Sequence, residues 1–136
     1  MRRISLAVLA LAIAVAAPGC GRSDDRAAVR SATQAFYDAI RADDGPAACE
    51  RLSEDAVAQL ESQSGQACGE AVTRLRYEGG RIERVEVYVT NAKVDLSSAE
   101  SAFLSEEPGG WKLSAIGCTP EDGKPRDRPL DCEVEA

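Results

Sequence analysis

The apolar residues of this chain change their spacing once, at Gly79-Gly80. From Val29 to Ile40 they recur every three or four positions, which is the period of a helix with one buried face. From Val85 to Leu96 they alternate with polar residues, which is the period of a half-buried strand. Helical segments followed by strand segments predict an α+β domain, with the helices packed on one face of an antiparallel sheet.

Capping residues and turns divide the two halves into elements. Helices are expected over residues 25–43, 46–52, 54–62 and 68–76, and strands over 85–90, 92–96, 102–104 and 111–116. Short turns between consecutive strands predict a four-stranded antiparallel meander. Residues 119–129 are rich in proline and charge, and we expect them to form a loop.

The N-terminus has the pattern of an export signal. Arg2 and Arg3 precede an apolar run, Ile4 to Ala17, and small residues follow that run. A membrane-spanning helix needs about 20 apolar residues. Since this run is shorter, a cleaved signal peptide is the better interpretation, and we expect the mature protein to be exported.

The residues Ala17-Pro18-Gly19-Cys20 resemble the lipobox of bacterial lipoproteins, in which a cysteine after a small residue receives diacylglycerol. This resemblance predicts a signal peptide over residues 1–19, a lipidated Cys20 with a short tether over 20–24, and one domain over 25–136. The mature protein would then be anchored on the extracytoplasmic face of the cell membrane. The alternative is ordinary cleavage near Ala16, which would leave Cys20 as a free thiol.

The cysteine count agrees with lipidation of Cys20. The chain has five cysteines, and exported proteins seldom keep an odd free thiol. The four that remain are expected to form two disulfides in an oxidising compartment: Cys49, Cys68, Cys118 and Cys132. Three pairings are possible. We favour the local one, which joins Cys49 to Cys68 and ties the C-terminal loop back by joining Cys118 to Cys132.

Charge and composition exclude several classes of function. Without Arg2 and Arg3 the chain has 14 basic and 23 acidic side chains, a formal charge of −9. Such a surface repels phosphate backbones, so we do not expect nucleic acid as a partner. The chain has no histidine and no C-x-x-C pair, so we expect no His-based triad, no metal site and no cofactor.

Three segments form a recognisable set. They are the opening helix with Phe36-Tyr37-x-Ala39-Ile40, the stretch from Ala47 to Ser53, and the strand Gly110-Trp111-Lys112-Leu113, which Gly117-Cys118 and Asp131-Cys132-Glu133 follow. In this order they resemble the NTF2-like (cystatin-like) α+β superfamily. More narrowly, the chain is similar to small NTF2-like lipoproteins of actinobacteria and related bacteria.

The resemblance implies a curved sheet around a long helix, with a conical pocket between them. The candidate pocket residues are Phe36, Tyr37, Ile40, Tyr88 and Trp111. Some members of the superfamily are isomerases or dehydratases, and others bind a ligand or a protein without chemistry. Because the sequence shows no catalytic motif, we expect a non-catalytic module that binds a small apolar ligand or an envelope protein.

Two other functions stay open. An isomerase- or dehydratase-type enzyme would use Tyr37, Asp38, Tyr88 or Asp95, and its carboxyl groups would need raised pKa values. A self-associating structural module, most simply a homodimer, is the other alternative. Trp111 is expected in the core, although an exposed Trp111 would be an interaction anchor.

Overall fold

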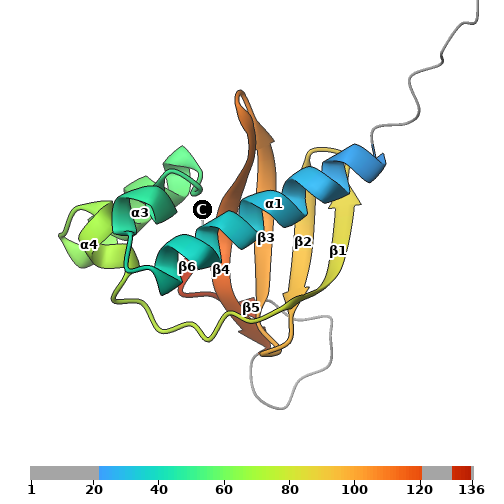
Figure 1. Cartoon of the computed structure of the whole chain (residues 1–136). Helices are drawn as coiled ribbons and strands as arrows, with labels where there is room; N and C mark the ends of the chain where they lie inside the picture. The colour runs from blue at the N-terminus through green and yellow to red at the C-terminus, as the bar shows by residue number, and fades with distance from the viewer. Residues whose placement is uncertain (1–21, 121–129, 136) are drawn as a thin grey trace, which may run out of the picture.

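The 20-residue helix α1 (Arg22–Arg41) lies across one face of an antiparallel sheet in the computed structural model (Figure 1). The structure describes residues 22–120 and 130–135, so the expected signal peptide and Cys20 lie outside the described residues. The stripe expected on this helix is buried, with Val29, Ala32 and Phe36 in the core. The helix begins at Arg22 rather than Asp25, so residues 22–24 of the expected tether are helical.

Three shorter helices follow α1: α2 (Gly45–Cys49), α3 (Glu54–Ser64) and α4 (Cys68–Val72). Ser53 caps α3 as expected, because its side chain accepts a hydrogen bond from the backbone N–H of Ala56 at 3.1 Å. α2 stops before the expected Leu52. The reason is tertiary: Leu52 bridges to Leu113 of the sheet, and the N–H of Ser53 donates to the carbonyl of Leu113 at 2.9 Å.

α2 and α4 lie in close backbone contact. A Cβ atom on Gly45 would lie 1.9 Å from the carbonyl oxygen of Gly69, so only glycine fits at this crossing. The Cys49–Cys68 disulfide joins the same two helices, and Cys118–Cys132 ties the C-terminus to the last long strand. The local disulfide pairing is therefore confirmed.

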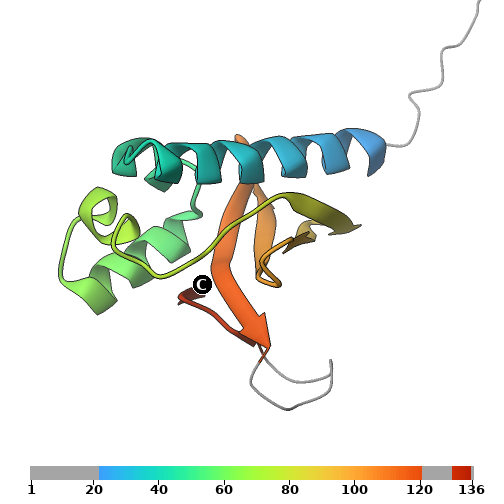
Figure 2. The same ribbon diagram turned by 60° about the horizontal axis from the view of Figure 1, so that its bottom comes forward.

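The sheet is antiparallel and its strands follow chain order. They are β1 (Ile82–Tyr88), β2 (Asn91–Leu96), β3 (Ser101–Glu107), β4 (Gly110–Pro120), β5 (Leu130–Asp131) and β6 (Val134–Glu135). Their order is β1-β2-β3-β4-β5, and β6 also pairs with β4. The first four strands confirm the meander, which in Figure 2 forms a layer under α1.

The expectation of four strands is wrong, because the described residues alone form a sheet of six. β5 and β6 contain two residues each, which is too short for a period-2 pattern to appear in the sequence. The Cys118–Cys132 disulfide holds this segment beside β4, where Val134 pairs with Ile116 and becomes buried. The coarse prediction is confirmed: the fold is α+β, with helices first, then an antiparallel sheet and two disulfides.

Candidate functional site

The structure places four of the five candidate pocket residues in or against the core. Phe36, Tyr37 and Trp111 are 0%, 3% and 7% exposed, and Ile40 packs partly buried against the same cluster. Tyr88 is separate from them, at the exposed end of β1. A side chain without accessible surface cannot line an open cavity, so Phe36 is a core residue. Trp111 is a core residue too, as expected.

Tyr37 belongs to an aromatic group that the sequence did not predict. Its ring makes an edge contact with Phe36 at a centroid distance of 5.1 Å, and another with Tyr77 at 6.1 Å. The Tyr77 hydroxyl donates to the carbonyl of Val72 at 2.8 Å, whereas the buried Tyr37 hydroxyl has no hydrogen-bond partner in the described part of the chain. The two tyrosines thus have similar surroundings and different hydrogen bonding.

Glu100 is a buried carboxylate next to these tyrosines. It is 6% exposed, and its two oxygens accept the backbone N–H groups of Glu78 and Gly79 at 2.8 and 2.9 Å. Gly79 has φ +63, and a Cβ atom there would lie 3.0 Å from the ring of Tyr37. Glu100 therefore holds the connection between α4 and β1 against the core. α4 ends at Val72 rather than near the expected Arg76.

Burial is the main cause that raises the pKa values of Tyr37 and Tyr77, and the negative charge of Glu100 raises both further. Both phenols therefore stay neutral at physiological pH. A neutral buried phenol can donate a hydrogen bond but cannot act as a base. This arrangement suits a structural or positioning role in the interior.

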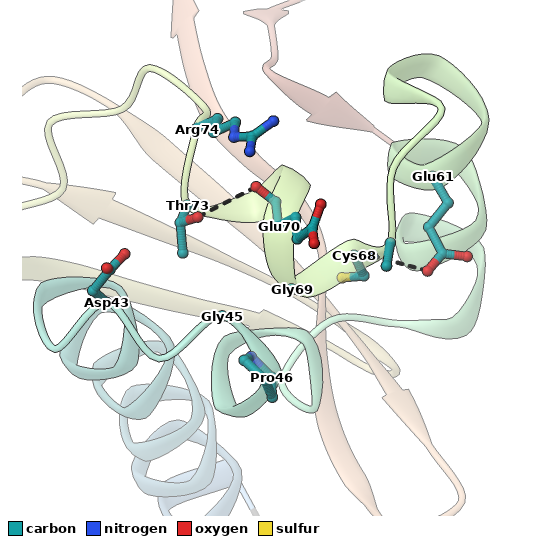
Figure 3. Close-up of a pocket in the computed structure, with 10 residues that line it drawn as sticks. Asp43, Gly45, Pro46, Glu61, Cys68, Gly69, Glu70, Thr73 and Arg74 are labelled. Atoms are coloured by element: carbon teal, nitrogen blue, oxygen red, sulfur yellow. Dashed lines mark hydrogen bonds between the residues drawn. The ribbon is translucent and has the colours of Figure 1, made fainter.

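A pocket of about 650 Å³ lies between the short helices (Figure 3). Three carboxylates and one guanidinium stand around it: Asp43, Glu61, Glu70 and Arg74. Glu61 already has a partner, since it accepts the backbone N–H of Cys68 at 2.9 Å. The pocket is acidic and its rim is exposed, and none of the five candidate pocket residues lines it.

A second shallow pocket lies between α1 and the start of β1. Its lining combines small and polar residues of the helix, including Ala27, Arg30 and Asp38, with Arg81 and Ile82. The guanidinium of Arg30 reaches the carbonyl of Ile82 at 3.5 Å. Asp38 is exposed, with Arg41 and Gln34 as its partners. This surface follows the edge of the helix and brings no acid–base pair together.

The outer face of the sheet, opposite α1, carries alternating charges. On β1 and β2 the cross-strand neighbours are Arg84 with Asp95 and Glu86 with Lys93. Along the strands, the Arg84 guanidinium lies 3.3 Å from Glu86 and the Lys93 ammonium 2.9 Å from Asp95. We call these four residues the outer ladder. It has two cations and two anions, so it is neutral within a strongly acidic chain.

Two neighbours extend the outer ladder. The Ser101 hydroxyl donates to Asp95 at 2.8 Å, and Phe103 of β3 lies opposite Lys93, half-buried on the outer face. Partial burial alone would raise the pKa of Asp95. Hydrogen bonds from Lys93 and Ser101, together with the charges of Lys93 and Arg84, outweigh that effect and hold the pKa below its usual value.

The sequence contained a signal for the outer ladder but none for Glu100. The polar residues that alternate with the inward-facing valines of β1 and β2 had to share one face, and strand pairing makes them neighbours. Glu100 follows the β2–β3 turn and resembles any exposed glutamate in sequence. Only the fold brings its carboxylate to Gly79.

Comparison with known proteins returns no match to a protein-family model, a curated protein or a solved structure. Within residues 22–120 and 130–135, no group of side chains has the composition and geometry to hold a metal ion. In the same residues, no helix has the length and apolar character that crossing a membrane requires.

Proposed function

We propose that the protein is a lipoprotein of the cell envelope, anchored through Cys20, whose NTF2-like domain binds a protein partner without chemistry. The outer face of the sheet is the binding surface. The observation that carries this proposal is the neutral outer ladder beside Phe103, in a chain whose mature part has a formal charge of −9.

The argument for a protein rather than a small ligand starts in the core. The aromatic side chains expected to line a conical pocket, Phe36, Tyr37 and Trp111, fill the space between helix and sheet themselves. A ligand there would have to displace packed side chains, which costs the contacts that hold the domain together. The outer face is already open and needs no rearrangement.

The outer face has the composition of a protein interface. A half-buried aromatic residue, Phe103, lies among charges that already pair with one another. Aromatic anchors contribute most of the affinity in such interfaces, and the surrounding polar rim sets the register. Long-range repulsion from an acidic partner is weakest over a neutral patch.

Self-association is the second candidate, and the same ladder favours it. Two cations and two anions in alternation become complementary to a copy of themselves under a two-fold rotation, which is the symmetry of most homodimers. The enzyme hypothesis stays a prediction. Among its candidates, Asp38 and Asp95 are engaged by cationic and hydroxyl groups of their own helix or sheet.

Replacement of Cys20 tests the anchor. Cys20→Ser should move the protein from the membrane fraction to the soluble fraction of the envelope, because acylation requires the thiol. Retention of the Cys20→Ser protein on membranes would contradict the proposed anchor.

Photo-cross-linking in cells tests the binding surface. A photoreactive phenylalanine analogue at position 103 should give a discrete cross-linked product, and the same analogue at exposed Gln63 of α3 should not. A product of twice the monomer mass would select self-association, and a heavier or lighter product would select another protein. Equal cross-linking from both positions would contradict the proposal that the outer face is the binding surface.

A further inference from the structure

The turn between β1 and β2 exposes two large hydrophobic side chains. Tyr88 is 57% exposed and Val89 is 87% exposed, and within the described residues these are the large hydrophobic side chains open to solvent. They are adjacent, and the segment from Val87 to Ala92 around them has no charged residue. Adjacent exposed apolar side chains indicate an interaction site more strongly than isolated ones do.

Val89 also has a backbone conformation that its side chain disfavours. Its φ of +53° lies in the left-handed region, where β-branched residues are outliers and Gly, Asn or Asp are usual in hairpin turns. The β3–β4 turn has the usual residues, with Gly109 and Gly110 at φ of 108° and 115°. A strained apolar residue at an exposed tip adds nothing to folding, and strain of this kind accompanies functional contacts.

The turn lies at the end of the molecule where the chain enters the domain. In both views the β1–β2 turn and the N-terminal end of α1 lie at the same end, while α3 and α4 lie at the other (Figures 1 and 2). Cys20 precedes Arg22 by two residues, and two residues span at most about 7 Å. A lipid on Cys20 therefore brings this end of the domain to the bilayer surface.

We propose that Tyr88 and Val89 form a second membrane contact, which inserts into the lipid headgroup region and fixes the orientation of the anchored domain. This inference rests on the proposed lipid anchor. Tyrosine suits the boundary between headgroups and acyl chains, because its ring is apolar and its hydroxyl is polar. The hydroxyl of Tyr88 already has a polar partner, since it donates a hydrogen bond to the carboxylate of Glu86 at 3.1 Å.

Because the lipid already holds the protein on the membrane, two inserted side chains are enough to fix its orientation. Two side chains alone would not hold a protein on a membrane, but the anchor turns their insertion into an intramolecular step with a high effective concentration. The proposed orientation also lifts α3, α4 and the acidic pocket away from the bilayer (Figure 1). In this orientation the β1–β2 end of the sheet contacts the bilayer. The outer ladder then faces parallel to the membrane surface, where a partner can reach it.

Quenching by brominated lipid tests the contact in the full lipidated protein. The probe is Tyr88→Trp, reconstituted in phosphatidylcholine vesicles. We choose this lipid, which has no net charge, because the backbone N–H of exposed Glu106 donates to the carbonyl of Thr90 and so places an acidic residue beside the turn. Its emission should fall by about half when the acyl chains are brominated, as expected for a ring at interfacial depth. Gln63→Trp in α3 is the matched control and should keep its intensity. The parent protein, whose single tryptophan is buried Trp111, gives the background.

Two variants separate the apolar contact from the backbone strain. In the Tyr88→Trp background, Val89→Thr keeps the branched shape and the strain but replaces one methyl group with a hydroxyl, so quenching should weaken while Tm stays unchanged. Val89→Gly should weaken quenching and raise Tm, because glycine relieves the strained φ.

Flotation of the same vesicles distinguishes the possible failures. If the lipidated protein floats but Tyr88→Trp is not quenched, the membrane contact is wrong and the anchor stands. If the wild-type protein does not float, both are wrong. A Tyr88→Trp ring that remains unquenched, but is shielded after an envelope protein is added, would assign the turn to a protein partner and overturn the membrane contact.

Discussion

The two faces of the sheet differ although they are made by the same strands. On β2 the residues Ala92, Val94 and Leu96 face α1 and are buried, while Lys93 and Asp95 between them face outward. β3 repeats this alternation, with Ala102 and Leu104 inward and Phe103 outward. The inner face is a closed apolar surface, and the outer face is a neutral polar surface with two aromatic residues, Phe103 and Tyr88.

The difference separates stability from recognition. Burial of apolar area under α1 supplies the free energy of folding. The paired charges of the outer ladder contribute little, because exposed ion pairs are worth at most about 1 kcal/mol. Residues on the outer face can therefore change without unfolding the domain, which is what a binding surface requires. Substitutions on one strand can test this division directly.

The largest effect should come from Leu104 and Phe103, neighbours on β3 with opposite faces. Leu104→Ala leaves a cavity in the core, and the free energy of unfolding should fall by about 3 kcal/mol. Phe103→Ala should lower it by less than about 1 kcal/mol, because Phe103 lies on the outer face, outside the core cluster, beside its cross-strand neighbour Lys93. Urea denaturation followed by circular dichroism measures both. Similar losses for the two variants would mean that the outer face is structural as well.

The next effect distinguishes the tyrosines of the core from Tyr88. Burial first, and then the charge of Glu100, raise the pKa values of Tyr37 and Tyr77. The folded chain keeps these protons where the unfolded chain releases them, so stability is complete below about pH 10 and declines as the pH rises above it. The pKa of Tyr88 is raised as well, by its hydrogen bond to Glu86 first, but this residue is exposed.

Absorbance at alkaline pH, recorded together with circular dichroism, should resolve these groups. One tyrosine should ionise reversibly in the folded protein, and the other two should ionise together with unfolding. If all three ionise while the circular dichroism remains native, Tyr37 and Tyr77 are not shielded as described. The variant Tyr88→Phe assigns the reversible step, because it should remove that step and leave the unfolding step in place.

Local patterns predicted most of the fold. The helical stripe of α1, the Ser53 cap and the strand alternation each act over a few residues, and the structure confirms all three. Of the three disulfide pairings that the four cysteines allow, the structure has the local one that we favoured. What the sequence could not show was tertiary. Leu52 leaves helix α2 to bridge Leu113, and β6 forms because a disulfide holds Val134 beside Ile116.

The candidate site was harder to predict for the same reason. The residues Phe36, Tyr37 and Trp111 were chosen as aromatic side chains near a pocket, and alternation alone does not distinguish a pocket lining from a filled core. No sequence pattern indicated the role of Glu100, because its partners are backbone N–H groups more than 20 residues away in sequence. By contrast, the sequence did indicate the outer ladder, because the polar residues that alternate with the valines of the inner face must lie on the opposite face.

The smallest effect should come from Asp95 in the outer ladder. Hydrogen bonds from Lys93 and Ser101 outweigh partial burial and lower the pKa of this carboxyl group. A lowered pKa in the folded state gives stability that is present above the unfolded pKa of about 4 and is lost as the pH falls through the folded value. Because the group is partly exposed, this contribution should stay below about 1 kcal/mol.

Denaturation between neutral pH and about pH 3 measures that contribution. The wild-type protein should lose more stability across this range than Asp95→Asn, which has no charge to lose. Ser101→Ala removes one hydrogen bond to the carboxylate and should fall between them, and a carbon-detected NMR titration of Asp95 should show its pKa rise. Identical acid sensitivity in all three proteins would show that the outer ladder is solvated rather than paired. A solvated ladder would keep its neutral charge but lose the fixed geometry that a specific partner needs, and the inner and outer faces would then differ in polarity alone.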